Sequence, residues 1–329
     1  INLTTSLQSH CKNKILIFLP ARNEAKTIAS VIGESKKELA KNSITADFLV
    51  VDDGSTDETK SESEKSGAFV ISYKEKKGLG FVFREAVKYS IKNNYDILIT
   101  IDSDKQFKES EIIKFINVLE KNEADFVTGS RFLPQSQTVN ISKVKKIGNK
   151  IGAWYISSVL KKKFSDVTCG FRGYNREAML HLHTFSDFTY TQEVFMNLGI
   201  KKLSIVEIPI TTVYYKDRKS KMVKSVFSYI AKSIKIILKF MILYAPMRLF
   251  SKIGNLFFIL GLIGTIFVFF WDRHTGTVTP YKWVGVMSLF LGSGWIIMYS
   301  VGMLLQVTSR IQLTIEEQLY LAKKNLYGK

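Results

Sequence analysis

The sequence predicts an α/β domain with a mostly parallel sheet, followed by a membrane-anchoring region. Three observations lead to this prediction. Short apolar runs alternate with helical patterns over residues 14–130, which is the rhythm of a parallel sheet covered by helices on both faces. Two uncharged runs of membrane-spanning length lie near the C-terminal end. Half of the net charge of +18 falls in one short segment directly before them.

The elements of the α/β domain follow one another regularly. We expect strands at 15–20, 48–51, 68–72, 97–101 and 126–128, and helices at 25–41, 57–66, 80–93 and 109–121. Ligands bind such sheets at the carboxyl ends of the strands. The residues that directly follow each strand are therefore the candidates for a functional site.

Composition excludes several classes of protein. With 46% hydrophobic and 23% charged residues, the chain is too apolar for a disordered protein. Its two cysteines, Cys11 and Cys169, provide neither a disulfide framework nor a zinc module. The positive charge lies beside apolar runs and no recognition motif accompanies it, so we expect no nucleic-acid partner.

The anchoring region combines a basic segment with two apolar runs. Residues 216–252 carry ten basic and one acidic side chain, and apolar residues at helical spacing over 222–241 predict an amphipathic helix in the membrane interface. A helix packed on the α/β domain is the alternative. The uncharged runs are long enough to cross a bilayer, with spans at about 253–271 and 283–305. Two buried helices of a soluble protein are the alternative for these runs.

The charge distribution also predicts topology and domain limits. Lys and Arg flank the hairpin while its loop carries few, so the positive-inside rule places the α/β domain and both termini in the cytoplasm. Glycines in the spans permit close helix contacts, and a homo-oligomer is left open: Gly261, Gly264, Gly285 and Gly292. We expect native residues before Ile1, and we recognise no signal peptide. The predicted parts are an N-terminal extension (1–13), the α/β domain (14–215), the interface segment (216–252), the hairpin (253–309) and a cytoplasmic tail (310–329).

Two adjacent carboxylates, Asp52 and Asp53, follow the second predicted strand. Ser55 and Glu58 have the spacing of a capping box, so part of this motif starts a helix. The capping box does not explain neighbouring carboxylates, whose repulsion requires a cation or hydrogen-bond donors. We therefore interpret Asp53 as a candidate binding residue.

Asp102 and Asp104 follow the fourth predicted strand. Carboxylates two residues apart in an extended turn can converge on one hard cation, and Mg²⁺ and Mn²⁺ prefer oxygen ligands. An Asp-x-Asp pair by itself is common in turns. At the end of a buried strand of a parallel sheet, it predicts a metal site that is shared with substrate phosphates.

Several motifs together resemble a known family. They are LPARNE (19–24), VVDDGSTDE (50–58), IDSDKQ (101–106), GSR (129–131), DVTCGFRGY (166–174), VEIPI (206–210) and an SK pair (220–221). Their order is similar to that of glycosyltransferase family 2, which has the GT-A fold. The sequence most resembles the branch of dolichyl-phosphate mannose synthases and polyprenyl-phosphate glycosyltransferases, over roughly residues 14–222.

The resemblance implies roles for individual residues. The nucleotide pocket would be lined by Pro20, Arg22, Glu24, Val51 and Asp53. The metal and the donor diphosphate would be held by Asp102, Ser103, Asp104 and Gln106. Arg131 and Lys221 would meet phosphate groups, and Glu193 would lie on the acceptor side. Tyr215 stands where relatives often have an arginine, and Arg218 is a candidate substitute.

We therefore expect a membrane-anchored, metal-dependent hexosyltransferase with inverting chemistry. It would move a sugar from a UDP- or GDP-sugar to a polyprenyl phosphate, dolichyl or undecaprenyl, with Mg²⁺ or Mn²⁺. The acceptor phosphate is already anionic, so it needs positioning and charge balance more than a general base. Candidates for a basic pocket are Arg131, Lys145, Lys146, Arg172 and Lys221. The alternatives are transfer to a lipid-linked oligosaccharide or a lipid headgroup, and a non-catalytic membrane scaffold.

Overall fold

The computed structural model describes residues 13–187, 190–214, 238–239 and 241–328. The chain divides into two compact units. The α/β unit comprises residues 1–230 together with 319–329, and the helical unit comprises residues 231–318.

A seven-stranded sheet forms the centre of the α/β unit, in the order β3-β2-β1-β4-β7-β5-β8. Its strands are β1 (Ile15–Ala21), β2 (Ala46–Asp52), β3 (Phe69–Ser72), β4 (Ile97–Thr100), β5 (Phe126–Ser130), β7 (Arg172–Asn175) and β8 (Ile205–Pro209). All neighbours are parallel except β7, which runs antiparallel to both β4 and β5. A second sheet pairs β6 (Gln137–Val139) with β9 (Thr211–Val213).

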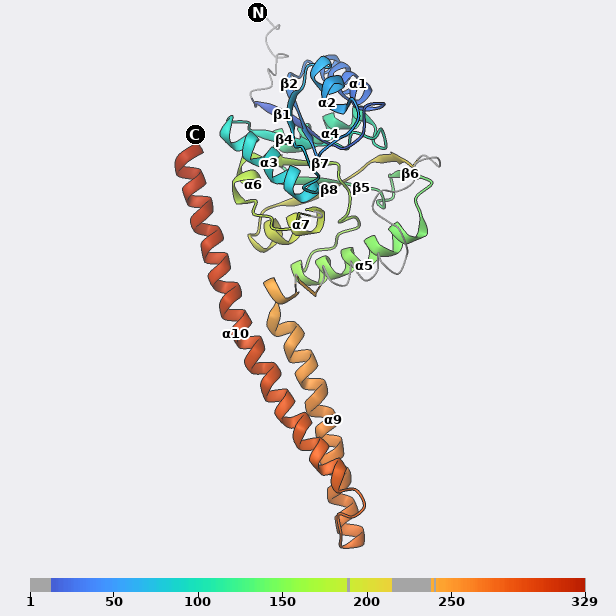
Figure 1. The fold of residues 1–329 in the computed structure, drawn as a ribbon, viewed down its shortest axis with the longest axis vertical. Helices are drawn as coiled ribbons and strands as arrows, with labels where there is room; N and C mark the ends of the chain where they lie inside the picture. Colours follow the sequence, from blue (N-terminus) through green and yellow to red (C-terminus); the bar gives the residue numbers. More distant parts are fainter. Residues whose placement is uncertain (1–12, 188–189, 215–237, 240, 329) are drawn as a thin grey trace, which may run out of the picture. The chain divides into compact units, whose positions relative to one another are not determined.

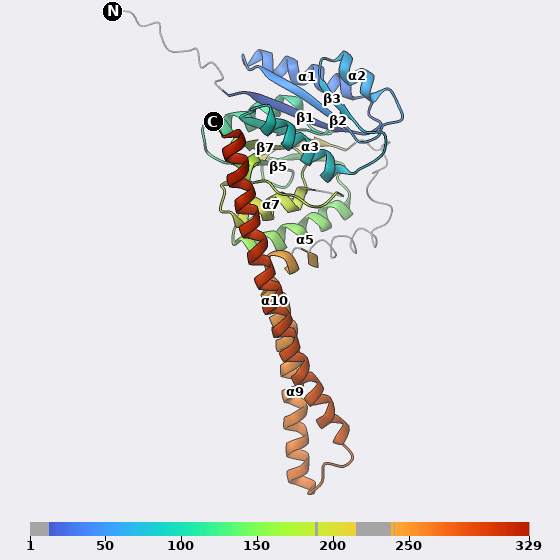
Figure 2. The ribbon, with the colours of Figure 1, turned by 60° about the vertical axis from the view of Figure 1, so that its left-hand side comes forward.

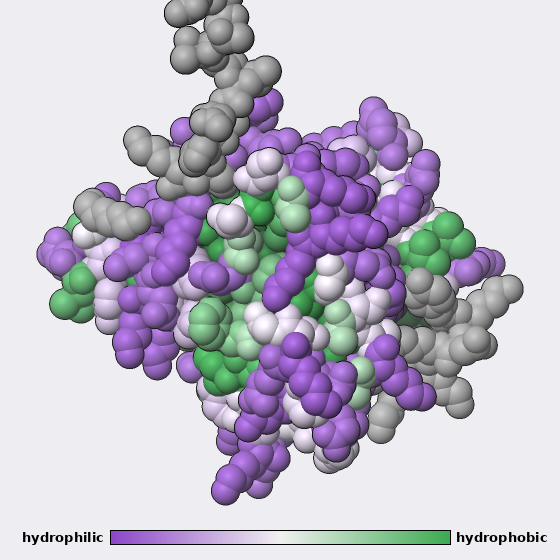
Figure 3. Space-filling model, turned by 90° about the horizontal axis from the view of Figure 1, so that it is seen from above, coloured by the Kyte–Doolittle hydropathy of each residue, from purple (hydrophilic) through white to green (hydrophobic). Residues whose placement is uncertain are grey.

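Helices cover both faces of the large sheet. They are α1 (Ile28–Lys41), α2 (Thr59–Lys65), α3 (Leu79–Lys92), the 3-10 turn η1 (Glu109–Glu111), α4 (Ile112–Glu120), α5 (Lys143–Leu160), α6 (Arg176–His181) and α7 (Thr191–Ile200). Figures 1 and 2 show α1 and α4 on one side of the sheet and α3 and α6 on the other. α5 packs on α7. The face seen in Figure 3 is mostly hydrophilic, with apolar side chains exposed near its middle.

The core follows from the periodicity of the sequence. Alternate residues of β1 and β4 meet the apolar stripes of α1 and α4, and all of them are buried. This cluster includes Ile15, Ile17, Leu19, Ile28, Val31, Ile32, Ile97, Ile99, Ile112, Phe115 and Ile116. Burial of such side chains is worth roughly 1.5–3 kcal/mol each before the cost of ordering the chain. The sheet edge that carries the loops is thus fixed by a dense core.

Every strand and helix that the sequence predicts over residues 14–130 is present, with its ends shifted by at most three residues. The predicted capping box of Ser55 and Glu58 is wrong. α2 begins at Thr59, and no side chain caps it. Ser55 instead donates its backbone N–H and its hydroxyl to the carboxylate of Asp52, because the chain is still in the loop after β2 at that point.

The antiparallel strand β7 has almost no sequence signal. Its residues are Arg-Gly-Tyr-Asn, without the apolar run of a central strand. Gly173 lies in its middle, and a Cβ there would come within 2.8 Å of the side chain of Leu119 and 2.9 Å of Ile99. The helix α4 side of the sheet thus leaves no room for a side chain at this position.

The helical unit contains most of two long helices, α9 (Pro246–Thr275) and α10 (Lys282–Tyr327). By length and composition both can cross a membrane. Gly261 and Gly264 face α10, since a Cβ on either would meet Ser288 at 3.1 and 2.3 Å. Gly285 and Gly292 border open space. Two of the four predicted contact glycines therefore bring α9 and α10 together.

Candidate active site

The loops after β1, β2 and β4 meet at one edge of the sheet. These strands are neighbours and parallel, and Ala21 at the end of β1 pairs with Asp52 at the end of β2. The three loops also bond to one another. The Thr27 hydroxyl donates to the Ser103 carbonyl and the Ser103 hydroxyl donates to the Pro20 carbonyl, both at 2.8 Å, and the N–H of Asn23 donates to the hydroxyl of Ser55 in the loop after β2 at 2.8 Å. Residues far apart in the sequence thus form one connected surface.

The first carboxylate pair at this edge is satisfied by the chain itself. Asp52 accepts from Ser55 and from the Ser72 hydroxyl, the latter at 2.8 Å. Asp53 accepts from the backbone N–H groups of Lys77 at 2.6 Å and Gly78 at 3.0 Å. Both aspartates are buried. Asp53 therefore connects the end of β2 to the loop that opens α3.

That loop requires glycine. Gly78 has φ +105°, and a Cβ on Gly78 would lie 2.3 Å from the Asp187 carbonyl oxygen. The N–H of Gly80 donates to the same oxygen at 2.9 Å. The segment 78–80 is therefore clamped between Asp53 on one side and Asp187 on the other.

The predicted nucleotide-pocket residues differ in exposure. Arg22 is exposed and Glu24 is half-buried. Asn23, between them, adopts φ 54° and accepts from Thr56 N at 2.8 Å. Val51 is fully buried in β2, so its side chain belongs to the core. A ligand at this edge would meet the backbone around Val51 more than its side chain.

The second carboxylate pair, Asp102 and Asp104, lies in the loop after β4. Burial, and then the charge of Asp104, raise the pKa of Asp102 to about 7, against the opposing charges of Arg131 and Lys145. Asp102 lies against Gly170, where a Cβ would be 2.9 Å from its carboxylate oxygen. The N–H of Gln106 donates to Asp104 at 3.1 Å. The two carboxylates thus lie close enough for the charge of Asp104 to act on Asp102, and the charges of Arg131 and Lys145 only partly oppose the upward shift.

This donor set fits a divalent cation shared with a substrate. Within the described ranges, no group of three or more His, Cys, Asp and Glu side chains could hold a metal by itself. Mg²⁺ and similar ions are commonly bound by one or two carboxylates together with substrate phosphates. A cation between Asp102 and Asp104 would also relieve the repulsion that raises the pKa of Asp102.

Arg131 has protein partners rather than an open approach to a phosphate. Its Nε and Nη2 atoms donate to the two oxygens of Asp166 at 2.6 and 2.8 Å. Further donors reach the Tyr214 hydroxyl at 2.6 Å and the Thr168 hydroxyl at 2.7 Å. Burial would lower the pKa of Arg131, but the charge of Asp166 holds it well above its usual range. Arg131 is therefore a buried residue that holds Asp166, Tyr214 and Thr168 together at the edge of the site.

Lys145 is a second basic side chain, besides Arg131, whose charge acts on the carboxylate pair. It lies in the first turn of α5, with its ammonium group 4.2 Å from the ring centre of Tyr214. Burial and the charge of Arg131 lower its pKa, while Asp104 and Asp102 oppose this shift. Lys146, by contrast, is exposed. A half-buried lysine beside a carboxylate pair is suited to a phosphate that the pair would bind through a metal.

Arg172 lies inside the core rather than in a basic pocket. Its side chain is fully buried, and it donates to the carbonyl oxygens of Cys169 and Thr191, both at 2.7 Å, and of Val167 at 3.2 Å. Its guanidinium also lies over the rings of Phe126, Tyr190 and Phe195. The interpretation of Arg172 as a substrate-binding residue is therefore corrected, because β7 places it in the centre of the sheet.

Glu193 is buried in the first turn of α7. Its carboxylate accepts from the N–H groups of Phe185 at 2.8 Å and Ser186 at 3.1 Å. Arg84 holds the same loop through the Ser186 carbonyl and an ion pair with Asp187. Glu193 thus orients the loop that presses on Gly78 and Gly80. Lys221, Tyr215 and Arg218 lie outside the described residues.

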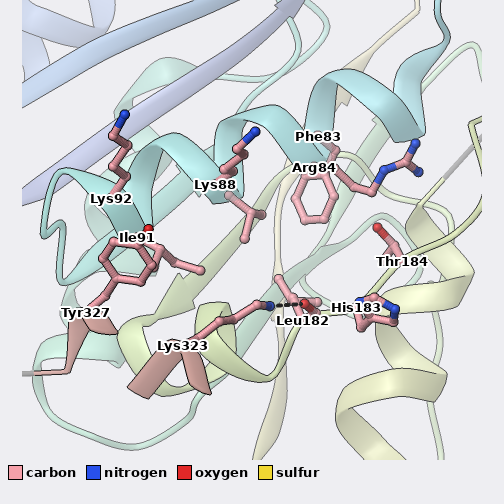
Figure 4. A pocket seen from close by; sticks show the side chains of 11 residues that line it. Phe83, Arg84, Lys88, Ile91, Lys92, Leu182, His183, Thr184, Lys323 and Tyr327 are labelled. Atoms are coloured by element: carbon pink, nitrogen blue, oxygen red, sulfur yellow. Dashed lines mark hydrogen bonds between the residues drawn. The ribbon is translucent and has the colours of Figure 1, made fainter. Parts of the chain in front are cut away.

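A pocket of about 290 Å³ is lined by side chains of α3, by residues 182–184 and by the last turns of α10. Figure 4 shows Tyr327 at its Ile91 end, and Thr184 and His183 at the other. Lys323 borders it and donates to the carbonyl oxygens of Leu182 at 3.0 Å and Leu180 at 3.3 Å. The last turns of α10 thereby contact the end of α6, just before the loop that Glu193 orients.

Most of the partners of Arg131 have no signal in the sequence that links them to it. Asp166 lies in the DVTCGFRGY motif, whose spacing from Arg131 indicates no contact, and Tyr214 lies outside every motif. Glu207, in the VEIPI motif, accepts from the N–H of Asp166 at 2.7 Å and of Ser165 at 2.8 Å. The order of the motifs along the chain was visible, but nothing in their spacing indicates which of them bond to one another.

A family model places these observations among known proteins. Residues 16–182, about half of the chain, match Glycosyl transferase family 2. The chain belongs to this family. Crystallised glucosyl-3-phosphoglycerate synthase from Mycobacterium tuberculosis, in complex with Mn²⁺ and UDP, superposes on this family 2 member with a TM-score of 0.54. It is 19% identical and is covered over 80% of its length, against 69% of this chain. That likeness shows the GT-A fold.

Curated relatives of this glycosyltransferase act on lipid phosphates. The undecaprenyl-phosphate mannosyltransferase of Micrococcus luteus is 27% identical over 218 residues, which cover 64% of this chain and 87% of the relative. The UDP-N-acetylglucosamine–dolichyl-phosphate N-acetylglucosaminyltransferase of Methanococcus voltae is 27% identical over 221 residues, 61% of this chain and 86% of the relative. The homologues are thus polyprenyl-phosphate sugar transferases at modest identity.

Proposed function

We propose that this glycosyltransferase transfers a sugar from a UDP- or GDP-sugar to a polyprenyl phosphate at the cytoplasmic face of a membrane. The observation that carries the proposal is the carboxylate pair Asp102 and Asp104, held beside Lys145 at the edge of the sheet. The curated relatives that act on undecaprenyl and dolichyl phosphate support the acceptor class. The two helices long enough to cross a membrane support an acceptor embedded in lipid.

The donor would lie across the loops after β1, β2 and β4. Asp53 and the clamped segment 77–80 shape the nucleotide side, and Asp102 and Asp104, with Gln106, would hold Mg²⁺ or Mn²⁺ on the diphosphate side. When bound, the metal supplies electrostatic stabilisation of the charge that develops on the departing nucleoside diphosphate. The complex of a GT-A neighbour with Mn²⁺ and UDP fits this arrangement.

The acceptor phosphate would approach beside Lys145. A polyprenyl phosphate is already anionic, so its oxygen attacks without a general base, and the protein's main tasks are orientation and charge balance. Lys145 is suited to both, because Tyr214 and the first turn of α5 hold it near the carboxylate pair. Arg131 and Asp166 would act by positioning Tyr214 and Thr168 around that lysine. We expect inversion at the anomeric carbon.

A transfer assay tests the proposal. The full chain in lipid nanodiscs is incubated with labelled UDP- and GDP-sugars and polyprenyl phosphate, with Mn²⁺, Mg²⁺ or EDTA. We expect a labelled, metal-dependent lipid product from one donor, absent with Asp104→Ala. Transfer only to a lipid-linked oligosaccharide would contradict the acceptor, and nucleotide binding without any transfer would favour a scaffold role.

A further inference from the structure

Helix α1 contacts the turn that carries the second carboxylate pair at two points. Thr27, which directly precedes α1, donates its hydroxyl to the Ser103 carbonyl at 2.8 Å. Glu34, on the helix itself, accepts from the Lys105 ammonium at 2.9 Å. A spacing of seven residues returns to the same side of a helix after two turns. α1 therefore holds the residues on both sides of Asp104.

The backbone of this turn depends on such contacts. Lys105 has φ 59°, in the left-handed region that is unfavourable for any residue with a side chain other than the short polar ones. The same turn brings the N–H of Gln106 to the Asp104 carboxylate at 3.1 Å. A strained conformation persists only where the surrounding structure holds it. The contacts of Lys105 are therefore the place to look for what fixes the turn.

Two carboxylates meet the Lys105 ammonium. The side chains of Lys105 and Glu34 are 34 and 51% exposed. The hydrogen bond from Lys105 lowers the pKa of Glu34 most, and one from Ser30 adds to this shift. Burial raises the pKa of Glu109 in η1; the charge of Glu34 adds to this shift and that of Lys105 opposes it. Lys105 is thus the cation that balances both carboxylates.

We propose that Glu34 and Lys105 are positioning residues for the metal site, because their ion pair fixes the turn in which Asp102 and Asp104 face the same cation. This inference rests on the proposed function, which assigns those two aspartates as metal ligands. Lys105 follows Asp104 in the chain, and its positive charge works against binding of a second cation there. A lysine at this position is explained by its contact with α1 and not by attraction to the metal.

The sign of one effect distinguishes positioning from charge. Lys105→Met removes a positive charge next to Asp104, which by electrostatics alone should tighten Mn²⁺ binding. If the ion pair positions the turn, Lys105→Met should instead weaken Mn²⁺ binding about two- to fivefold, the range expected for a partly exposed ion pair. Electron paramagnetic resonance of the full chain with Mn²⁺ and UDP or GDP measures the Kd. Tighter binding by this variant would overturn the proposal.

Two matched variants accompany this titration. Lys108→Met removes an exposed lysine three residues further along the chain, and it should not weaken Mn²⁺ binding. Lys105→Arg keeps the ion pair and should stay within about twofold of the unmodified protein. Weakening by Lys108→Met equal to that by Lys105→Met would mean that the ion pair has no special role.

A double-mutant cycle tests whether the two residues act as one unit. Glu34→Gln should weaken Mn²⁺ binding about as much as Lys105→Met does, and it should add nothing in the Lys105→Met background. High salt should reduce the effect of either single substitution, since the pair is partly exposed. Effects that simply add would show that the residues act independently, against the proposal.

Hydrogen exchange tests the turn without any metal. In metal-free protein, Lys105→Met and Glu34→Gln should speed amide exchange over residues 102–106 several-fold, while the melting temperature and the exchange of the Lys108→Met variant stay unchanged. Unchanged exchange in both variants would overturn the proposal. If the unmodified protein binds no Mn²⁺ with nucleotide, the proposed metal site fails, and the exchange rates still decide whether the ion pair holds the turn.

Discussion

Two pairs of neighbouring aspartates end the two strands that flank β1, and they are treated in opposite ways. Asp52 and Asp53, after β2, accept hydrogen bonds from two serines and from the backbone of the loop before α3. Asp102 and Asp104 follow β4, where burial, and then the charge of Asp104, raise the pKa of Asp102 to about 7. Similar sequence patterns thus produce one pair whose charges are met by hydrogen-bond donors and one pair in which the pKa of a carboxyl is raised.

This difference between the two pairs indicates a structural role for one and a binding role for the other. Buried charge that the chain satisfies with its own donors stabilises a particular loop arrangement. Buried charge that it leaves under-compensated costs free energy, and a cation or a cationic substrate group can recover that cost. We therefore propose that the pair after β2 would build the nucleotide side of the site and that the pair after β4 would bind a metal.

The largest expected effect concerns Asp166, a buried carboxylate whose charge is fully paired within the protein. Asp166→Asn removes the charge that neutralises buried Arg131, so we expect a loss of about 3–5 kcal/mol of folding free energy. The pKa of Asp166 is lowered mainly by Arg131, against the effect of burial. Its contribution is therefore present above the ordinary pKa of Asp and is lost as the pH falls through the lowered value. Thermal and denaturant unfolding of the protein would measure both effects, with exposed Glu123→Gln as the unchanged control.

The next effect is on transfer. Asp104→Asn should reduce sugar transfer about 100- to 1000-fold, as expected for the loss of a charge that stabilises the transition state, while the protein stays folded. Transfer kinetics beside a melting curve would measure this. Loss of folding without metal would show that Asp104 is structural, like Asp52. The contrast between the two aspartate pairs would then be wrong.

A smaller effect distinguishes the two pairs by stability alone. Asp53→Asn weakens the acceptor of two backbone N–H groups in a buried site and should cost about 1–3 kcal/mol. Asp102→Asn should be neutral or stabilising in metal-free protein, because it removes like-charge repulsion. Unfolding with EDTA present measures both. Equal destabilisation by the two substitutions would contradict the account.

The smallest effect is a pH dependence. Because burial and then the charge of Asp104 raise the pKa of Asp102 to about 7, its contribution to stability is full below the ordinary pKa of Asp and is lost as the pH rises from that value to about 7. Metal-free Asp102→Asn should therefore gain on the unmodified protein by up to about 1.4 kcal/mol per pH unit over that range, with no further gain at higher pH. Unfolding at a series of pH values between about 4 and 8 would show it, and added Mn²⁺ should remove the difference by stabilising the unmodified protein.

The elements that could be predicted from the sequence are those with a pattern of apolar residues or a motif within their own residues. Alternating apolar runs predicted β1 to β5, and the motif after β4 predicted the carboxylate pair. β7 and the partners of Arg131 could not be predicted, because they depend on contacts between segments that are distant in the chain. Arg172 illustrates the limit: a positive residue in a family motif suggested a substrate pocket, yet three carbonyl oxygens and three aromatic rings hold it in the core.

The most direct test of the central claim is a titration of Mn²⁺ by electron paramagnetic resonance, in the presence of UDP or GDP. The unmodified protein and Asp53→Asn should both bind one Mn²⁺ together with the nucleotide, the latter with weaker nucleotide affinity. Asp102→Asn and Asp104→Asn should lose that bound ion. Retention of Mn²⁺ in both variants, or its loss in Asp53→Asn alone, would contradict the assignment of the pair after β4 as the metal site.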